Sequence, residues 1–184
     1  MKTICEITDR DVLSTDGRSS APPRCTARAI VINHDGLYAV MYAEKFKLYS
    51  LPGGGIEMGE DALTALRREI LEETGCSCDE ITELGAVWEN RAHCDYTQCS
   101  YYYVVKTNSV PSAPSLTPNE QRNRTSVCWR SLTEVVDLIT SPKHDTNQRK
   151  FLQMRDVAAL REYQHVMSHP TESLTFLQNS CPDS

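Results

Sequence analysis

The chain of 184 residues lacks the features that mark membrane, secreted and nucleic-acid-binding proteins. No apolar run approaches the length of a membrane-spanning helix, and the first residues, MKTICEITDRDV, lack the apolar core of a secretory signal. Basic residues are not in excess, because the net charge is −6 at pH 7. These absences argue against membrane insertion, secretion and general nucleic-acid binding, and they predict a cytoplasmic protein.

The eight cysteines do not follow the spacing of a structural zinc site. The closest clusters are Cys76 with Cys78 and Cys94 with Cys99, and neither forms the paired C-x2-C pattern of such sites. Without a secretory signal, disulfides are not expected either. We therefore predict free thiols, mostly buried, and keep zinc as the alternative.

The chain also lacks internal repeats and any linker that would divide it into two domains. Its length is sufficient for one domain with its own core. We predict a single domain over residues 1–167, followed by a polar C-terminal tail over residues 168–184. Segments typical of strands alternate with segments typical of helices, which indicates a mixed α/β fold.

Local patterns place the expected elements along the chain. Residues 1–12 are typical of an edge strand or hairpin arm, and 108–123, with three prolines, of a long mobile loop. The expected strands cover 28–33, 37–43, 48–51, 81–90, 100–106 and 125–130, and the expected helices cover 61–74, 132–139 and 147–166.

The most informative of these elements is the helix expected from Asp61 to Thr74. It contains neither Gly nor Pro, and Gly75 follows at the position just past a helix end. Leu63, Leu66 and Ile70 recur at helical spacing, which predicts one apolar stripe facing a core.

Three carboxylates share a neighbouring face of that helix. Glu69, Glu72 and Glu73 lie at i, i+3 and i+4 in its last turns, where their mutual repulsion and the helix dipole both disfavour them. A bound cation would reverse this cost. Clustered carboxylates suit a hard cation, Mg2+ or in its place Mn2+. The glycines at 53–55 lie just before the helix, where they let backbone approach a ligand closely.

The stretch from Gly54 to Cys76, GGIEMGEDALTALRREILEETGC, contains the pattern G-x5-E-x7-R-E-U-x-E-E-x-G-U, where U is bulky and aliphatic. It resembles the signature of the Nudix hydrolase family, with Cys76 at the last U as the one departure. The resemblance implies the Nudix fold, an α/β/α sandwich around a mixed sheet. It also implies hydrolysis of a nucleoside diphosphate linked to another moiety X, with metal ligands from Glu69, Glu72, Glu73 and the carbonyl of Gly53.

The resemblance also implies roles for residues besides the metal ligands, and a second role for Glu72. Arg68 would hold a glutamate in position through a charge-assisted hydrogen bond. Glu72 could relay the proton of the attacking water in addition to binding metal. The general base could instead be Glu120, in the segment SLTPNEQRN, although a solvent-exposed loop acid is an equal interpretation. Glu60 is a signature residue that could support the metal ligands from outside.

The substrate is only coarsely specified as a small nucleotide-type molecule, and no substrate-binding residue is assigned. Arg28, Lys45, Lys47 and Arg91 flank the expected site and could meet phosphates. Nucleoside triphosphates or oxidised deoxynucleoside triphosphates are candidate substrates, and the resemblance allows a homodimer. The alternatives are a catalytically silent binding module of the same fold and an isopentenyl-diphosphate isomerase, which would use a paired Cys and Glu.

Overall fold

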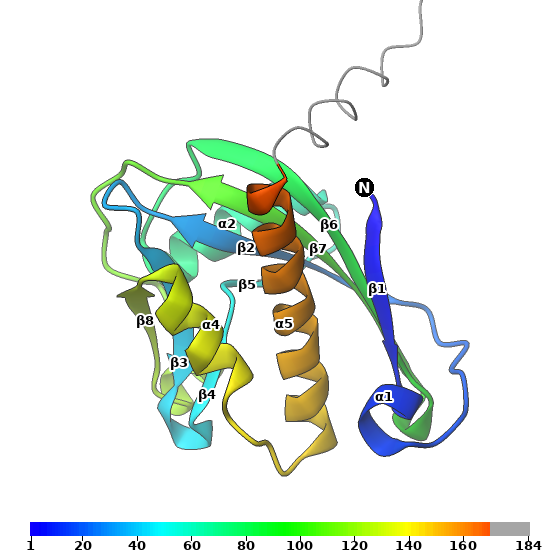
Figure 1. Cartoon of the computed structure of the whole chain (residues 1–184). Helices are drawn as coiled ribbons and strands as arrows, with labels where there is room; N and C mark the ends of the chain where they lie inside the picture. Colours follow the sequence, from blue (N-terminus) through cyan, green and yellow to red (C-terminus); the bar gives the residue numbers. More distant parts are fainter. Residues whose placement is uncertain (170–184) are drawn as a thin grey trace, which may run out of the picture.

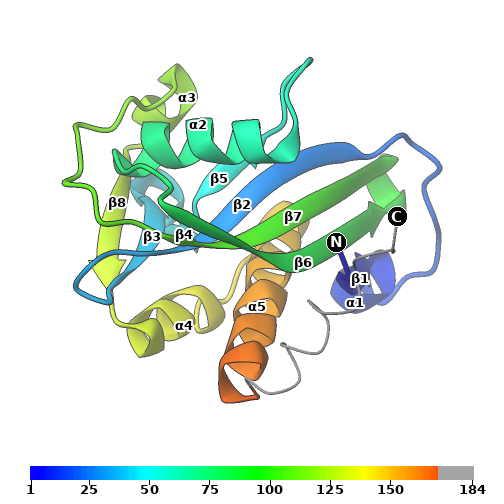
Figure 2. The same cartoon turned by 90° about the horizontal axis from the view of Figure 1, so that it is seen from above.

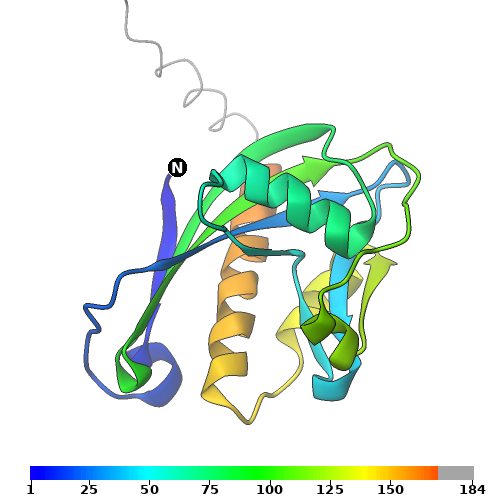
Figure 3. The same ribbon diagram turned by 180° about the vertical axis from the view of Figure 1, so that it is seen from behind.

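A mixed β-sheet with helices on both faces forms the framework of the protein (Figure 1). The structure is a computed structural model, and it describes residues 1–169. Helix α2 lies on one face of the sheet, and α4 and α5 lie on the other (Figure 2). Figure 3, from behind, shows α2 over the sheet with α5 on the far side. The predicted α/β/α sandwich is confirmed, while residues 170–184, most of the expected tail, lie outside the described part of the chain.

The strands include every expected one and one more, and the helices include two short additional ones. The strands are β1 (Thr3–Thr8), β2 (Arg24–Ile32), β3 (Tyr38–Ala43), β4 (Leu48–Ser50), β5 (Gly53–Gly55), β6 (Glu80–Arg91), β7 (Tyr96–Lys106) and β8 (Thr125–Arg130). The helices are α1 (Asp9–Leu13), α2 (Ala62–Thr74), α3 (Pro118–Arg122), α4 (Leu132–Thr140) and α5 (Asn147–Ser168), with 3-10 turns η1 (Glu44–Phe46) and η2 (Ala92–Cys94).

The eight strands form one sheet in the order β1-β6-β7-β2-β3-β4. β5 pairs with β2, and β8 pairs with β3. β2 runs parallel to β7 and β1 parallel to β6, whereas β6 and β7 form a long antiparallel hairpin closed by η2. Residues 91–98 are therefore mostly strand and tight turn, because β6 and β7 continue their ladder to the end of the hairpin.

Two hydrophobic clusters separate the faces of the sheet. The cluster under α2 contains Ala65, Leu66 and Ile70, and the cluster under α4 and α5 contains Tyr102 and Phe151. Alternation along β7 places Tyr102 on the α5 side and its two tyrosine neighbours on the α2 side.

The apolar stripe of α2 differs from the prediction at one position. Leu66 and Ile70 are fully buried, but Leu63 is 44 % exposed. The small side chains of Ala62 and Ala65 take the place next to the sheet, which turns Leu63 towards solvent. The cysteines among residues 1–169 are free thiols as predicted, but only Cys76, Cys78 and Cys99 are buried, so the expectation that most are buried is wrong. No helix in that range is long and apolar enough to span a membrane.

Candidate active site

Local capping fixes both ends of α2. The Asp61 side chain accepts a hydrogen bond from the backbone N–H of Thr64 at 2.7 Å and so caps the first turn. Gly75 ends the helix with a φ of 73°, a left-handed conformation that favours glycine. A Cβ at Gly75 would also lie 2.0 Å from the carbonyl oxygen of Ser112. The helix therefore ends immediately after its three glutamates and packs tightly against the following loop.

The glycine segment forms strand β5. Gly53 pairs with Arg28, and Gly54 with Ala27, in an antiparallel ladder with β2. This ladder brings the backbone of β5 under α2. A Cβ at Gly54 would lie 2.3 Å from Oε1 of Glu69, so only glycine allows the carboxylate to rest against this backbone.

Glu73 is the most deeply buried of the three glutamates. Glu73 is only 7 % exposed. Its Oε2 accepts a hydrogen bond from the N–H of Gly53 at 2.6 Å. Burial raises the pKa of Glu73 to about 8, against the lowering effect of that hydrogen bond. Burial also raises the pKa of Glu69, although the neighbouring Arg68 opposes it. Both carboxylates would gain from a nearby cation.

Arg68 connects the glutamates to the glycine strand. It donates to Glu60 through Nε at 2.8 Å and to Glu69 through Nη1 at 2.8 Å. Its Nη2 donates to the carbonyl of Gly55 at 2.9 Å, and Nη1 lies 3.4 Å from Oε2 of Glu72. The hydrogen bond from Arg68 is the main cause that lowers the pKa of Glu60 to about 2. Arg68 thus orients the carboxylates around β5.

The glutamate carboxylates and the backbone carbonyls of β5 suit a hard divalent cation, since carboxylate and carbonyl oxygens are the ligands that Mg2+ and Mn2+ prefer. Within residues 1–169, however, no three His, Cys, Asp or Glu side chains are arranged closely enough to hold an ion. Glu69 and Glu73 are directed to Arg68 and to the N–H of Gly53 instead. Each of these hydrogen bonds uses one carboxylate oxygen, so the second oxygen of each glutamate could still bind a cation.

Glu120 lies in α3, inside the segment expected to be a mobile loop. Its carboxylate accepts from the backbone N–H of Thr117 at 2.7 Å and completes a capping box. The segment is attached to the end of α2, because Ser115 donates its N–H to the carbonyl of Glu72 at 2.7 Å. The charge of Glu120 contributes to the raised pKa of Glu73, so α3 brings this acid to the same side of the molecule.

A cavity of about 570 Å³ opens beside β5 on the α5 face of the sheet. Of the four cations predicted to meet phosphates, Arg28 and Arg91 line it, whereas Lys45 lines a separate, smaller groove. Lys47 lines neither of the two. The cavity lining consists of Arg24, Thr26, Arg28, Gly54, Gly55, Arg91, His93, Cys94, Tyr96, Gln98, Gln148, Leu152 and Arg155.

Sequence reasoning missed two of the arginines in this lining. Arg24 alternates with Thr26 and Arg28 along β2, which is a signal that all three point to one face. Arg155 gave no comparable signal, because a charged residue on a long helix is normally solvated. In the structure it is only 3 % exposed.

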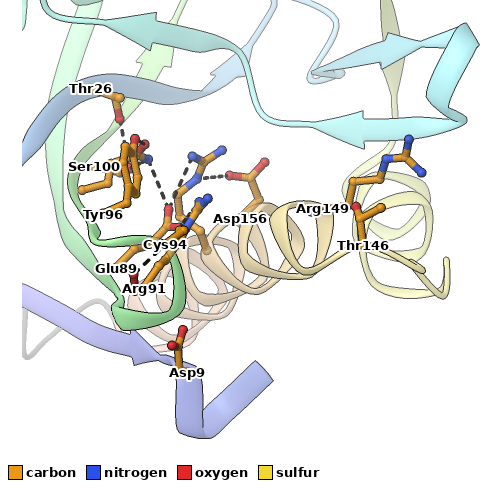
Figure 4. A network of polar contacts seen from close by, with 12 residues as sticks. Asp9, Thr26, Glu89, Arg91, Cys94, Tyr96, Ser100, Thr146, Arg149 and Asp156 are labelled. Atoms are coloured by element: carbon orange, nitrogen blue, oxygen red, sulfur yellow. Dashed lines mark hydrogen bonds and ion pairs between the residues drawn. The ribbon is translucent and has the colours of Figure 1, made fainter. Parts of the chain in front are cut away.

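A network of buried charges lies behind the cavity and includes two of its lining arginines, Arg91 and Arg155 (Figure 4). Glu89, 1 % exposed, accepts from Nε of Arg91 at 2.9 Å and forms an ion pair with Nη1 of Arg155 at 3.6 Å. Asp156, fully buried, accepts from Nε of Arg155 at 3.1 Å and from the hydroxyl of Tyr102 at 2.5 Å. These pairs join α5 to the sheet directly behind the cavity.

Two nitrogens in this region are buried without a hydrogen-bond acceptor. They are Nε of Arg28 and Nη2 of Arg155, and they are the only such side-chain atoms within residues 1–169. An unsatisfied buried donor costs about 1–3 kcal/mol. Both arginines line the same cavity, but these two nitrogens themselves are buried behind its surface.

Known proteins share this framework. A family model described as NUDIX domain matches residues 22–154. An RNA pyrophosphohydrolase from Bartonella henselae is 34 % identical over 89 residues, which are 44 % of this chain and 50 % of that protein. The chain spans half or less of the length of the curated relatives it matches.

Solved structures of low sequence identity show the same fold. A NUDIX hydrolase from Nitrosomonas europaea superposes with a TM-score of 0.57 at 20 % identity, covering 78 % of this chain and 90 % of that one. A MutT NUDIX hydrolase from Burkholderia pseudomallei gives 0.52 at 21 % identity, covering 73 % and 98 %. Together with the family model, which covers well over half of the sequence, and with the glutamate helix set against a glycine strand, these likenesses show that the chain belongs to the Nudix hydrolase family.

Proposed function

We propose that this chain is a nucleotide pyrophosphohydrolase, which hydrolyses a phosphoric anhydride bond in a nucleoside diphosphate linked to another moiety. Nucleoside triphosphates, including oxidised deoxynucleoside triphosphates, are the candidate substrates. The observation that carries the proposal is the contact of Glu69 with the backbone of Gly54, beside an arginine-lined cavity. The name of the curated relatives, RNA pyrophosphohydrolase, supports the same class of bond.

In this proposal Glu69, Glu72, Glu73 and the carbonyl of Gly53 hold Mg2+, for which Mn2+ can substitute. The cation supplies positive charge to the phosphoryl oxygens. Arg68 keeps the carboxylates oriented through the hydrogen bonds described above. The oxygen of a water molecule forms a new bond to phosphorus while the bond to the leaving phosphate oxygen breaks, and the water proton passes to Glu72 or to Glu120.

The two rival functions gain less support from the site. An isomerase would need a carboxylate paired with a cysteine. Cys94 lines the cavity, but none of the described residues lining it is acidic. A silent binding module is disfavoured because the carboxylates and Arg68 of the signature are all present. The cytoplasmic location and the homodimer stay predictions of the sequence.

A panel of nucleotides incubated with Mg2+, with Mn2+ or with EDTA tests the proposal. We expect turnover of at least one substrate class with either metal and none with EDTA, because the transition state carries negative charge that the cation offsets. Separate measurement of phosphate and pyrophosphate identifies the leaving group. An absence of turnover across the panel, or turnover that EDTA leaves unchanged, would contradict the proposal.

The role of Glu120 can be separated from its part in the capping box. Glutamine also completes a capping box, so Glu120→Gln should leave the free energy of unfolding nearly unchanged. If Glu120 accepts the water proton, the same substitution lowers kcat by about 10²-fold. Steady-state kinetics and urea unfolding of the same preparation give both quantities.

The control for this variant is Glu134→Gln, because Glu134 occupies the matching position of a second capping box with Ser131 at the start of α4. We expect this variant to keep both its stability and its turnover. Equal kcat values for Glu120→Gln and Glu134→Gln would show that Glu120 is only a cap and would leave Glu72 as the base.

A further inference from the structure

The tip of the β6–β7 hairpin, residues 90–97, forms one end of the cavity. Four of its side chains line the cavity: Arg91, His93, Cys94 and Tyr96. The guanidinium of Arg91 lies over the ring of Tyr96, 5.0 Å from its centroid, and over the ring of Phe151, 4.7 Å from its centroid. The hairpin tip therefore brings a ring and a guanidinium together at the cavity, a combination on which nucleobases stack.

The hairpin tip lies far from the glycine strand along the sheet. Gly55 pairs with Thr26, and Thr26 pairs with Ser100 on β7. Tyr96 precedes Ser100 by four residues on the same strand. Two strand spacings and the rise over these residues place Tyr96 on the order of 15 Å from Gly55. A nucleotide whose scissile phosphates lie at the glycine strand therefore reaches the hairpin tip with its nucleoside.

The hairpin tip extends past the strands on either side of it. β1 pairs with β6 as far as Asn90, and β2 pairs with β7 only from Gln98 onwards. Within the described residues, 91–97 therefore pair only with each other in the sheet. Contacts from outside the sheet must fix where this part of the cavity wall lies.

The N-terminal segment, residues 9–21, supplies such contacts. Asp9, the first residue of α1, is 2 % exposed, and its Oδ2 accepts the backbone N–H of His93 at 2.7 Å. Its Oδ1 lies 2.7 Å from Nδ1 of the same histidine. Figure 4 shows Asp9 next to the hairpin tip that carries Arg91 and Tyr96. One buried carboxylate thus holds both the backbone and the ring of His93.

A second group of contacts joins the hairpin tip to the other end of the segment. Ser19 donates its backbone N–H to Oδ1 of Asn90 at 2.8 Å, and its carbonyl accepts from Nδ2 of that residue at 3.1 Å. The hydroxyl of Ser19 donates to Oδ1 of Asp95 at 2.7 Å. Thr97 donates its hydroxyl to the carbonyl of Ala21 at 2.8 Å. The segment therefore holds the hairpin tip on both strands and at its turn.

We propose that Asp9 and Ser19 are positioning residues for the nucleoside of the substrate, because they hold the hairpin tip where Tyr96 and Arg91 meet it. The inference rests on the proposed function in that it places the scissile phosphates at the glycine strand. Both residues precede residue 22, where the match to the family model begins, and neither lines the cavity. They act through the hairpin tip, because a site that is in place for only a fraction of the time binds its ligand more weakly by that fraction.

Titrations in EDTA test this proposal without turnover. The probes are ADP, GDP, CDP and UDP, together with inorganic pyrophosphate, which has two phosphates and no nucleoside. Isothermal titration of the full chain, by competition for weak probes, gives their dissociation constants. We expect the native chain to bind at least one nucleoside diphosphate about tenfold or more tightly than pyrophosphate, because only the nucleoside reaches the hairpin tip.

Two variants release the hairpin tip by different amounts. Asp9→Ala removes both contacts to His93, and we expect it to weaken binding of the preferred nucleoside diphosphate about tenfold, as a tip in place for about a tenth of the time gives. Pyrophosphate should bind within about twofold of its native affinity. Ser19→Ala removes one exposed hydrogen bond to Asp95, so this variant should fold even if the first does not, with a selective loss of about threefold.

Asp16→Ala is the matched control, because Asp16 lies in the same segment and its carboxylate pairs with Arg10 instead. This variant should bind every probe as the native chain does. A merely structural role of Asp9 would lower the folded fraction and so weaken pyrophosphate and nucleoside diphosphates by the same factor.

Equal weakening of both kinds of probe, or no weakening in the variants that fold, would overturn the proposal. A native chain that binds nucleoside diphosphates no more tightly than pyrophosphate would overturn it as well, since the hairpin tip would then meet no nucleoside. Failure of the proposed function gives a different result: the nucleotide panel then shows no metal-dependent turnover, whatever the outcome of the titrations in EDTA.

Discussion

Glu73→Gln is expected to remove turnover and at the same time to stabilise the chain in EDTA. The substitution keeps the size of the side chain but replaces one proposed metal ligand by a neutral amide. Since the charge stabilisation supplied by a catalytic cation amounts to several kcal/mol, we expect kcat to fall by about 10³-fold or more.

The gain in stability follows from the pKa of the same carboxyl group. Burial raises the pKa of Glu73 from its ordinary value of 4.5 to about 8. Between these values the folded chain holds a proton that the unfolded chain has released, so the free energy of unfolding falls as the pH rises from about 4.5 to about 8. Glutamine never ionises. In EDTA at about pH 8, the variant should therefore exceed the native chain in stability by a few kcal/mol.

Urea unfolding at about pH 5 and about pH 8, with EDTA and with Mg2+, measures this effect. Mg2+ should stabilise the native chain and leave the variant nearly unchanged, because the ion binds only the folded, ionised site. Glu83→Gln, an exposed glutamate on β6, is the control and should alter neither quantity. A variant that turns over substrate normally, or that is less stable than the native chain at about pH 8, would show that Glu73 is structural.

The parts of the site that the sequence predicted are those fixed by local chemistry. The spacing of the acidic residues and the glycine at Gly75 depend only on neighbours along the helix, and the structure contains them as expected. Alternation along a strand is equally local, which is why the opposite orientation of Tyr102 was predictable.

The parts that were not predictable depend on partners distant in sequence. Gly53 and Gly54 form a strand only because β2 offers an edge to pair with. Arg155 is buried only because Glu89 and Asp156 neutralise it in the folded state, and no helical pattern shows this. Leu63 fits the apolar period, but smaller side chains take its place at the sheet.

Asp156→Ala is expected to cause the largest loss of stability among single substitutions outside the signature. Asp156 is fully buried, and besides Arg155 and Tyr102 it accepts a hydrogen bond from the backbone N–H of Leu51 at 2.9 Å. Its removal leaves a buried guanidinium with a weaker partner in Glu89 and an unpaired N–H. Removal of one partner of a buried ion pair costs about 3–5 kcal/mol.

The matched control is Asp145→Ala, because Asp145 also pairs with an arginine, Arg149, at 3.0 Å but is 80 % exposed. An exposed pair of this kind contributes about 0.5 kcal/mol or less. Urea unfolding of both variants measures the contrast. If both lose a similarly small amount, the buried charges behind the cavity do not stabilise the fold.

Asp156→Asn divides the contribution of charge from that of hydrogen bonding. The amide oxygen can still accept from Leu51 and Tyr102, so the loss of stability should be smaller than for alanine, while Arg155 keeps only Glu89 as a charged partner. Leu51 lies two residues before Gly53, and the hydrogen bond to Asp156 holds the entry to the glycine strand. If alanine lowers kcat well beyond asparagine at a temperature where both are folded, α5 positions the catalytic strand through Leu51. Equal kcat values would instead limit Asp156 to the charge balance of the buried network behind the cavity.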